Sequence, residues 1–149
     1  MKIALGSDHG GLRLKKEIIK HLEKKGIEFK DFGTYSEDSC DYPDFAEKVA
    51  VEVAAKNFEF GILVCGTGIG ISIAANKVPG IRAALCSDTF SAHATREHND
   101  ANILALGERI VGPGLALDIV DAFLNAKFEG DRHTKRINKI SEIEKKYKK

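Results

Sequence analysis

A glycine-rich turn that follows an apolar run is the part of this sequence best suited to chemistry. Residues 60–65 form a short apolar run, the pattern of a strand buried on both faces. Three glycines at alternate positions, Gly66, Gly68 and Gly70, end this strand and open a helix-like segment over 71–77. Glycines permit a tight turn and let backbone N–H groups approach an anion, and the helix adds the positive end of its dipole. The turn therefore predicts an anion-binding site.

A cysteine stands immediately before this turn. At the carboxyl end of a strand and beside a helix N-terminus, the thiolate of Cys65 is stabilised and could act as nucleophile or base. The alternative is that Cys65 is a small buried strand residue. Cys40 and Cys86 have no comparable neighbours in the sequence, so we expect both to be structural.

Apolar runs alternate with helical patterns along the whole chain. This alternation predicts a parallel sheet covered on both faces, a three-layer α/β/α, Rossmann-like fold with a five-stranded parallel sheet. We expect a single domain over 1–149, in which 132–149 form a basic C-terminal helix. The expected strands are 2–6, 27–32, 60–65, 81–86 and 102–107, and the expected helices are 14–25, 43–56, 71–77, 88–98, 115–126 and 134–149.

Composition narrows the class of protein. Hydrophobic residues make up 43% of the 149 residues and charged residues 30%, which is typical of an ordinary globular protein. Three cysteines without a C-x-x-C pair argue against a disulfide framework or a zinc site. No secretion signal and no membrane span is apparent, so we expect a cytoplasmic protein without a membrane partner.

Charge is distributed unevenly along the chain. Residues 1–131 carry 15 Lys/Arg against 20 Asp/Glu, a net −5, whereas residues 132–149 carry 8 against 2, a net +6. Such a tail could bind nucleic acid, an acidic surface or a small phosphate. Tyr147 is its only aromatic residue for stacking on bases, so we expect no nucleic-acid partner. The same segment carries an apolar stripe of Ile137, Ile140, Ile143 and Tyr147.

Two candidate groups follow the first and third strands. In parallel sheets, ligands bind beyond the carboxyl ends of the strands, where the winding reverses. Asp8-His9 and Cys65-Gly66 therefore offer chemistry at the same edge. Asp8 and His9 could bind sugar hydroxyls or orient a proton, or they could be a helix cap followed by a surface histidine.

Further candidates lie near the fifth strand and in the basic tail. His98 could be a general acid near neutral pH, although it also fits an ordinary helix end. Arg132 and Arg136 lie one helical turn apart, a suitable fork for one phosphate, with a solvated basic face as the alternative. Arg109, just past the fifth strand, also lies at the ligand edge.

A dinucleotide site is a rival interpretation of the glycine turn. It would have the spacing G-x-G-x-x-G and an acidic residue about 20 positions later. Here Ile71 occupies the sixth place, although Asp88 follows at a suitable distance. The glycine spacing alone is weak support for a nucleotide.

Five motifs taken together resemble the type B ribose-5-phosphate isomerases, within the ribose/galactose isomerase family. The resemblance covers essentially the whole chain, in order. It rests on Ser-Asp-His-Gly-Gly at 7–11, Asp-Tyr-Pro-Asp at 41–44, Cys-Gly-Thr-Gly-Ile-Gly at 65–70, His-Asn-Asp-Ala-Asn at 98–102, and Arg132-His133-x-x-Arg136.

The resemblance implies a metal- and cofactor-independent enzyme of the pentose phosphate pathway that interconverts ribose 5-phosphate and ribulose 5-phosphate. It also implies a homodimer, or a dimer of dimers, with active sites at the subunit interface. By resemblance, the catalytic residues would be Cys65 as base, Thr67 as proton shuttle and His98 in ring opening. Those that hold the sugar would be Asp8, His9, Tyr42 and Asn99, and those that hold the phosphate Arg109, Arg132, His133 and Arg136, some of them from the partner.

The chemistry of isomerisation agrees with this assignment. An aldose–ketose exchange passes through an enediolate, so it needs one base that takes and returns a proton and fixed donors for the oxyanion. Cys65 supplies the base, and the N–H groups of Gly66, Thr67, Gly68, Ile69 and Gly70 supply donors. Two alternatives stay open: isomerisation of a six-carbon sugar phosphate, such as galactose 6-phosphate or allose 6-phosphate, and a nucleotide-binding regulatory module.

Overall fold

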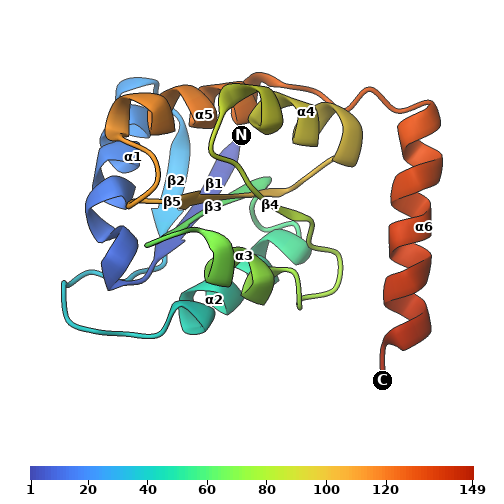
Figure 1. Cartoon of the computed structure of the whole chain (residues 1–149), viewed down its shortest axis with the longest axis horizontal. Helices are drawn as coiled ribbons and strands as arrows, with labels where there is room; N and C mark the ends of the chain where they lie inside the picture. Colours follow the sequence, from blue (N-terminus) through green and yellow to red (C-terminus); the bar gives the residue numbers. More distant parts are fainter.

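The computed structural model describes residues 1–149 as one parallel sheet between two layers of helices (Figure 1). The strands lie in the order β2-β1-β3-β5-β4, and every neighbouring pair is parallel. This confirms the predicted fold class. The strands are β1 (Lys2–Ser7), β2 (Glu28–Asp31), β3 (Phe60–Cys65), β4 (Ala83–Leu85) and β5 (Ile103–Gly107).

Helices cover the two faces of the sheet and bury two apolar clusters. Helices α1, α4 and α5 pack on one face, and α2 and α3 pack on the other (Figure 1). Every residue of β3 and β5 is buried, as expected for central strands covered on both sides. The helices are α1 (Leu12–Lys24), α2 (Tyr42–Ala54), α3 (Ile69–Ala75), α4 (Thr89–Asn99), α5 (Pro113–Asn125) and α6 (Arg132–Tyr147), and a short 3-10 turn, η1, spans His9–Gly11.

Strand β4, predicted over 81–86, is shorter in the structure and spans only Ala83–Leu85. The strand begins later because the N–H of Ile81 donates to Val78 within a turn and that of Arg82 donates to the side chain of Asn102. Helix α6 also begins two residues earlier than predicted, at Arg132. None of the helices combines the length and the apolarity that crossing a membrane requires.

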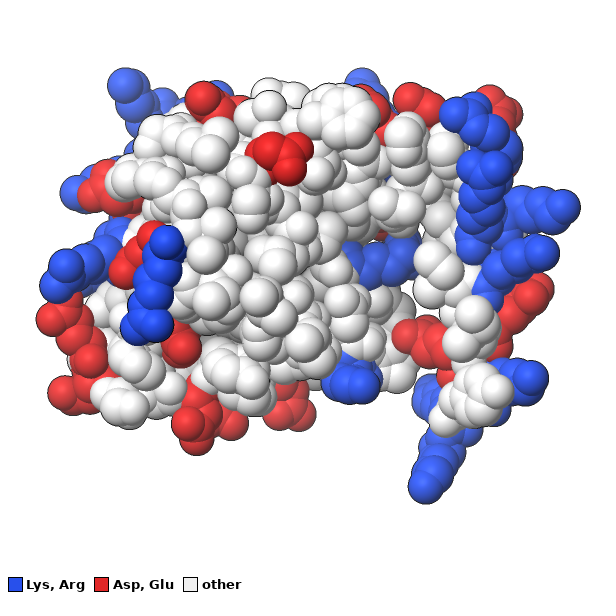
Figure 2. All heavy atoms as spheres, in the orientation of Figure 1, with Lys and Arg blue, Asp and Glu red and all other residues white.

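Helix α6 stands away from the rest of the molecule (Figure 1). Of its apolar stripe only Ile137 is buried, whereas Ile140, Ile143 and Tyr147 are 49%, 60% and 72% exposed. A cavity of about 590 Å³ lies between this helix and the sheet layer. Figure 2 shows Lys and Arg side chains along α6 and mostly uncharged atoms on the body that it faces. The stripe is therefore left largely uncovered within one chain.

A buried ion pair ties the start of α1 to the loop after β2. The Lys15 side chain is fully buried, and its Nζ donates to Asp31 Oδ1 at 2.7 Å and to the carbonyl of Thr34. Burial lowers the pKa of Lys15, while the hydrogen bond that Lys15 donates to Asp31 opposes that shift. Asp31 also accepts from the N–H of Gly33 at 2.9 Å. This pair fixes the path of the chain that leads to Tyr42.

We expect substitution of Asp31 to lower the free energy of unfolding more than substitution of Lys15. Asp31→Ala leaves a buried ammonium without its carboxylate and should lower the free energy of unfolding by about 3–5 kcal/mol. Lys15→Met should lose less, because the remaining carboxylate of Asp31 is 23% exposed and reaches water. Urea denaturation measures both. Glu37→Ala, in the exposed pair with Arg13, is the control and should lose under about 1 kcal/mol; the reverse order of Asp31 and Lys15 would refute this account.

Candidate active site

The carboxyl ends of β1 and β3 meet at the point where the winding of the sheet reverses. The chain passes from β1 outward to β2 and then returns to the other side of β1 as β3. Ser7 pairs with Val64, so the residues that follow them are neighbours. A Cβ placed on Gly10 would lie 3.3 Å from the nitrogen of Gly66. The prediction that Asp8-His9 and Cys65-Gly66 share one edge is confirmed.

The sulfur of Cys65 receives a hydrogen bond from the turn that follows it. Cys65 is the last residue of β3 and is 4% exposed, and the N–H of Gly68 donates to its Sγ at 3.1 Å. Gly68 has φ +77°, and a Cβ there would lie 2.5 Å from Leu85 Cδ1. Only glycine fits this conformation and this space. The turn thus fixes a backbone donor at the sulfur, an arrangement suited to a thiolate.

The glycine turn also presents unused donors. The N–H groups of Gly66, Thr67 and Gly70 donate to no other group of the chain, and the hydroxyl oxygen of Thr67 accepts from the N–H of Ile69 at 3.2 Å. Unpaired N–H groups gathered in one turn are the donors that a developing oxyanion requires.

Three further predicted residues surround the turn. Asp8 is 7% exposed, and its Oδ1 has no hydrogen-bond partner. Since buried polar atoms are almost always paired, this carboxylate oxygen is available to a ligand hydroxyl. The Tyr42 ring lies against Gly70, because a Cβ on that glycine would be 2.5 Å from Tyr42 Cζ. The Arg109 guanidinium lies over Gly66, 3.5 Å from where a Cβ would stand.

Cys40 lies beside this site, although we expected it to be structural because it has no comparable neighbours in the sequence. Its N–H donates to His9 Nδ1 at 3.1 Å, and its Sγ is 3.8 Å from the same nitrogen. Because Nδ1 accepts, the neutral His9 ring carries its proton on Nε2. No local signal could have revealed this contact, since the two residues are 31 positions apart and meet through the path of a loop.

The remaining predicted residues gather at the opposite edge of the sheet. His98 and Asn99 end α4, which runs back from the carboxyl edge toward the start of β5. His133, in the first turn of α6, stacks on His98 with ring centroids 4.4 Å apart. Arg132 and Arg136 flank it and are exposed.

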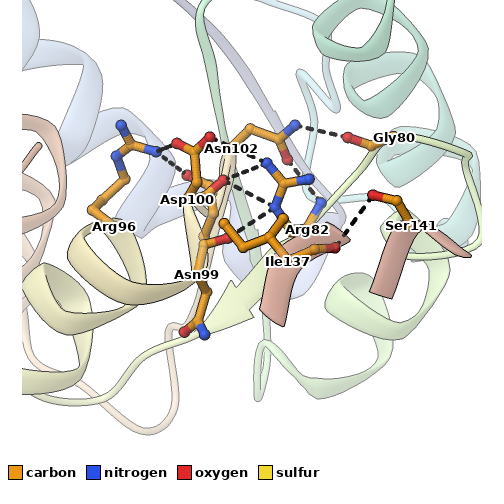
Figure 3. Close-up of polar contacts among 9 residues, drawn as sticks. Gly80, Arg82, Arg96, Asn99, Asp100, Asn102, Ile137 and Ser141 are labelled. Atoms are coloured by element: carbon orange, nitrogen blue, oxygen red, sulfur yellow. Dashed lines mark hydrogen bonds and ion pairs between the residues drawn. The ribbon is translucent and has the colours of Figure 1, made fainter. Parts of the chain in front are cut away.

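A network of two arginines holds the end of α4 in place (Figure 3). Asp100 adopts a left-handed conformation with φ 46°, and its carboxylate accepts from Arg96 at 2.7 Å and from Arg82 at 3.4 Å. Arg82 Nε also donates to the carbonyl of Asn99 at 2.8 Å. Arg96 is buried, with its guanidinium 4.5 Å from the centroid of the Phe60 ring. This network fixes the backbone that carries His98 and Asn99.

The two groups of residues cannot meet within one chain. Cys65 pairs with Gly107 at the carboxyl end of β5, whereas the His98 group lies before Ile103 at its amino end. At about 3.3 Å per residue, this strand alone separates the two edges by roughly 13 Å. The predicted site residues therefore form two groups at opposite edges of the sheet.

Two sequence candidates have other roles in the fold. Asp88, the candidate acidic residue of a dinucleotide site, caps α4 by accepting a hydrogen bond from the N–H of Ser91 at 2.6 Å. This hydrogen bond lowers the pKa of Asp88. Cys86 is 2% exposed, and burial raises its pKa to about 11, as expected for a structural thiol.

Potential metal ligands gather at His98, Glu129 and His133, whose ligand atoms lie within 4.8 Å of one another.

The fold and the site define a class: a parallel three-layer α/β protein whose β1/β3 crevice places a thiol beside a glycine turn with free N–H groups. Within that class, the chain belongs to the ribose/galactose isomerase family, whose model matches residues 3–140.

Curated relatives and solved structures agree with this membership. The chain is 54% identical to ribose-5-phosphate isomerase B of Escherichia coli over 143 residues, which cover 96% of each chain. It is also 54% identical to a putative sugar phosphate isomerase of Bacillus subtilis, over 98% of this chain and 99% of the relative.

Two solved structures are similar along nearly their whole length. Ribose-5-phosphate isomerase B of Clostridium thermocellum has a TM-score of 0.98 and 62% identity, covering 99% of this chain and 100% of the other. The Mycoplasma genitalium enzyme with bound ribulose 5-phosphate has a TM-score of 0.93 and 46% identity, covering 97% and 96%.

The contact between Cys40 and His9 makes a prediction about proton position. When the His9 ring is neutral, two-bond ¹H–¹⁵N spectra should show Nδ1 without a proton and Nε2 with one. His93 is an internal control of opposite type, because its Nδ1 faces the Glu97 carboxylate at 3.1 Å and should carry the proton. A protonated Nδ1 on neutral His9 would contradict the contact.

Proposed function

We propose that this chain is an aldose–ketose isomerase that interconverts ribose 5-phosphate and ribulose 5-phosphate. The observation that carries the proposal is the thiol of Cys65 at the β1/β3 crevice, with a backbone donor at its sulfur and the unpaired Asp8 Oδ1 beside the same turn. The whole-length similarity to ribose-5-phosphate isomerases B, one of them with bound ribulose 5-phosphate, supports this substrate.

Proton transfer belongs to Cys65 in this proposal. As thiolate it takes the proton from C2 of the linear aldose, which leaves an enediolate, and it then delivers that proton to C1 of the ketose. Thr67 moves the hydroxyl proton between O1 and O2. The free N–H groups of the turn stabilise the oxyanion, and loss of one such donor typically costs about 3–4 kcal/mol in the barrier.

Sugar and phosphate contacts divide between the remaining predicted residues. Asp8 and Tyr42 bind sugar hydroxyls, and His9 offers its Nε2–H as a donor. Arg109 binds the phosphate from the same chain as Cys65. Binding energy from the phosphate, remote from C1 and C2, then positions the linear sugar.

The group of residues at the amino end of β5 acts as a second half-site, which completes the crevice of a neighbouring chain. His98 assists ring opening, Asn99 binds the sugar, and Arg132 and Arg136 bind the phosphate, all across a twofold axis in a homodimer. The strand-length separation from Cys65 within one chain supports this arrangement. The exposed stripe of Ile140, Ile143 and Tyr147 supplies apolar surface for the partner. Three free cysteines suit a reducing cytoplasm.

Removal of the thiol tests the proposed base. Cys65→Ala should reduce kcat for ribose 5-phosphate by several orders of magnitude, because it removes the group that takes the proton from C2 and returns it to C1. Binding of the sugar phosphate should persist, since the turn and Arg109 remain. Initial rates in the presence of a chelator and calorimetric binding measure the two effects.

Cys86→Ala is the matched control for this substitution. Its thiol is buried away from the crevice, so kcat should change little. If Cys65→Ala keeps more than about a tenth of the activity, a change of only ~1.4 kcal/mol, another residue is the base. A chain that converts a six-carbon aldose 6-phosphate faster than ribose 5-phosphate would overturn the proposed substrate.

Complementation tests the assignment of Arg136 to the partner's site. Cys65→Ala should be nearly inactive alone, and Arg136→Ala should keep only a small, measurable residual activity. If the arginine acts in trans, a co-refolded heterodimer has one site with both defects and one with neither, so activity should return toward half per dimer. No recovery, with the heterodimer confirmed by mass spectrometry, would place Arg136 in the site of its own chain.

A further inference from the structure

The rings of His98 and His133 stack on each other and link two helices. Their rings are nearly parallel, 13° apart, with centroids separated by 4.4 Å. His133 is 5% exposed and His98 is half-buried, so the buried His133 ring supports one face of the His98 ring. The pair joins the end of α4 to the first turn of α6, two elements that otherwise contact little.

We propose that His133 is a positioning residue, which holds the ring of His98 by stacking, and that it is not a ligand of the substrate phosphate. This inference rests on the proposed function, in which His98 opens the sugar ring. It departs from the role that the family resemblance implies for His133.

The surroundings of His133 argue against phosphate binding. Its Nε2 is buried, has no hydrogen-bond partner, and faces Glu129 Oε2 at 3.6 Å. A carboxylate beside that nitrogen repels a phosphate. Burial first, and then the charge of Arg132, lower the pKa of His133, so its ring is neutral near pH 7. Arg132 and Arg136 are instead exposed and permanently charged, as a phosphate fork requires.

The geometry of the pair also argues against a metal. The ligand atoms of His98, Glu129 and His133 are close enough to suggest a site. However, a histidine nitrogen binds a metal in the plane of its ring. The two rings are nearly parallel and stacked, so one ion cannot lie in the plane of both rings, as ligation by both nitrogens requires. The arrangement suits contact between ring faces.

A second contact holds the supporting ring in place. The N–H of Glu129 donates to the carbonyl of Glu97 at 3.0 Å, which anchors the segment before α6 to the residue next to His98. Asp100 and its two arginines restrain the same helix end from the other side. The backbone of His98 is thus fixed by the arginine network, and its ring by His133.

Two variants of similar size separate stacking from simple space filling. His133→Phe keeps a flat ring against His98 but has no nitrogen, whereas His133→Leu fills the space without a flat face. Arg136→Ala serves as the reference for loss of a phosphate contact. For each variant we would measure kcat and KM for ribose 5-phosphate, and the inhibition constant of inorganic phosphate.

The proposal makes a distinct prediction for each variant. His133→Leu should lose at least tenfold in kcat, with the inhibition constant of phosphate changed less than twofold. His133→Phe should recover at least a third of the wild-type kcat. Arg136→Ala should raise the inhibition constant of phosphate tenfold or more. The proposal is overturned if either His133 variant raises that constant as Arg136→Ala does, or if the Phe variant loses as much kcat as the Leu variant.

A spectroscopic measurement tests the stack without reference to activity. In the unliganded protein, the ring protons of His98 should be shifted upfield by the neighbouring ring, and the shift should survive in His133→Phe and disappear in His133→Leu. Unshifted protons in the wild-type chain would refute the stack. Failure of the wild-type chain to isomerise ribose 5-phosphate would instead refute the proposed function and leave the spectrum unaffected, so the two failures are distinguishable.

Discussion

A parallel strand has its two ends at opposite edges of its sheet, and this constraint governs the functional organisation of the chain. Of the crevice residues, Asp8 follows β1 and Cys65 is the last residue of β3, whereas His98 precedes β5. No adjustment of loops within the chain can bring His98 to the thiol across β5 and its buried neighbours. The chemistry of isomerisation, which needs ring opening and proton transfer on one sugar, thus favours two copies of the chain, each lending one edge to the other.

The two half-sites are built by different physical means. At the crevice, positions are set by backbone: Gly68 donates to Cys65, and the N–H of Cys40 donates to His9. At the opposite edge, buried and partly buried side chains do the same task, with Arg96 over aromatic rings and Asp100 between two cations. A buried charge is tolerated only where its partners are complete, so this edge is sensitive to the loss of any one of them.

Much of this organisation could be predicted from the sequence, because it depends on periodicity and on the direction of parallel strands. The five strands, and the meeting of Asp8 with Cys65 at one edge, follow from those rules and are confirmed. The contact of Cys40 with His9 could not be predicted, since it depends on the path of a loop that a buried lysine, Lys15, holds from another helix. At the opposite edge, residue type and spacing suggested an acid at His98 and a phosphate fork at Arg132 and Arg136; the family resemblance made these roles specific, and they stay predictions.

Alignment between the half-sites then depends on α6, which carries both the arginine fork and the uncovered apolar stripe. Ile140 and Ile143 line the cavity beside this helix, and Glu144 attaches its far end to the N–H of Gly80 at 3.1 Å. A helix that is anchored at few points can adjust to a partner, but the His98 ring cannot share that freedom if it is to have the proposed role in opening the sugar. The stack of His133 on His98 reconciles the two requirements, because it couples the first turn of α6 to the rigid end of α4 and leaves the rest of the helix to dock.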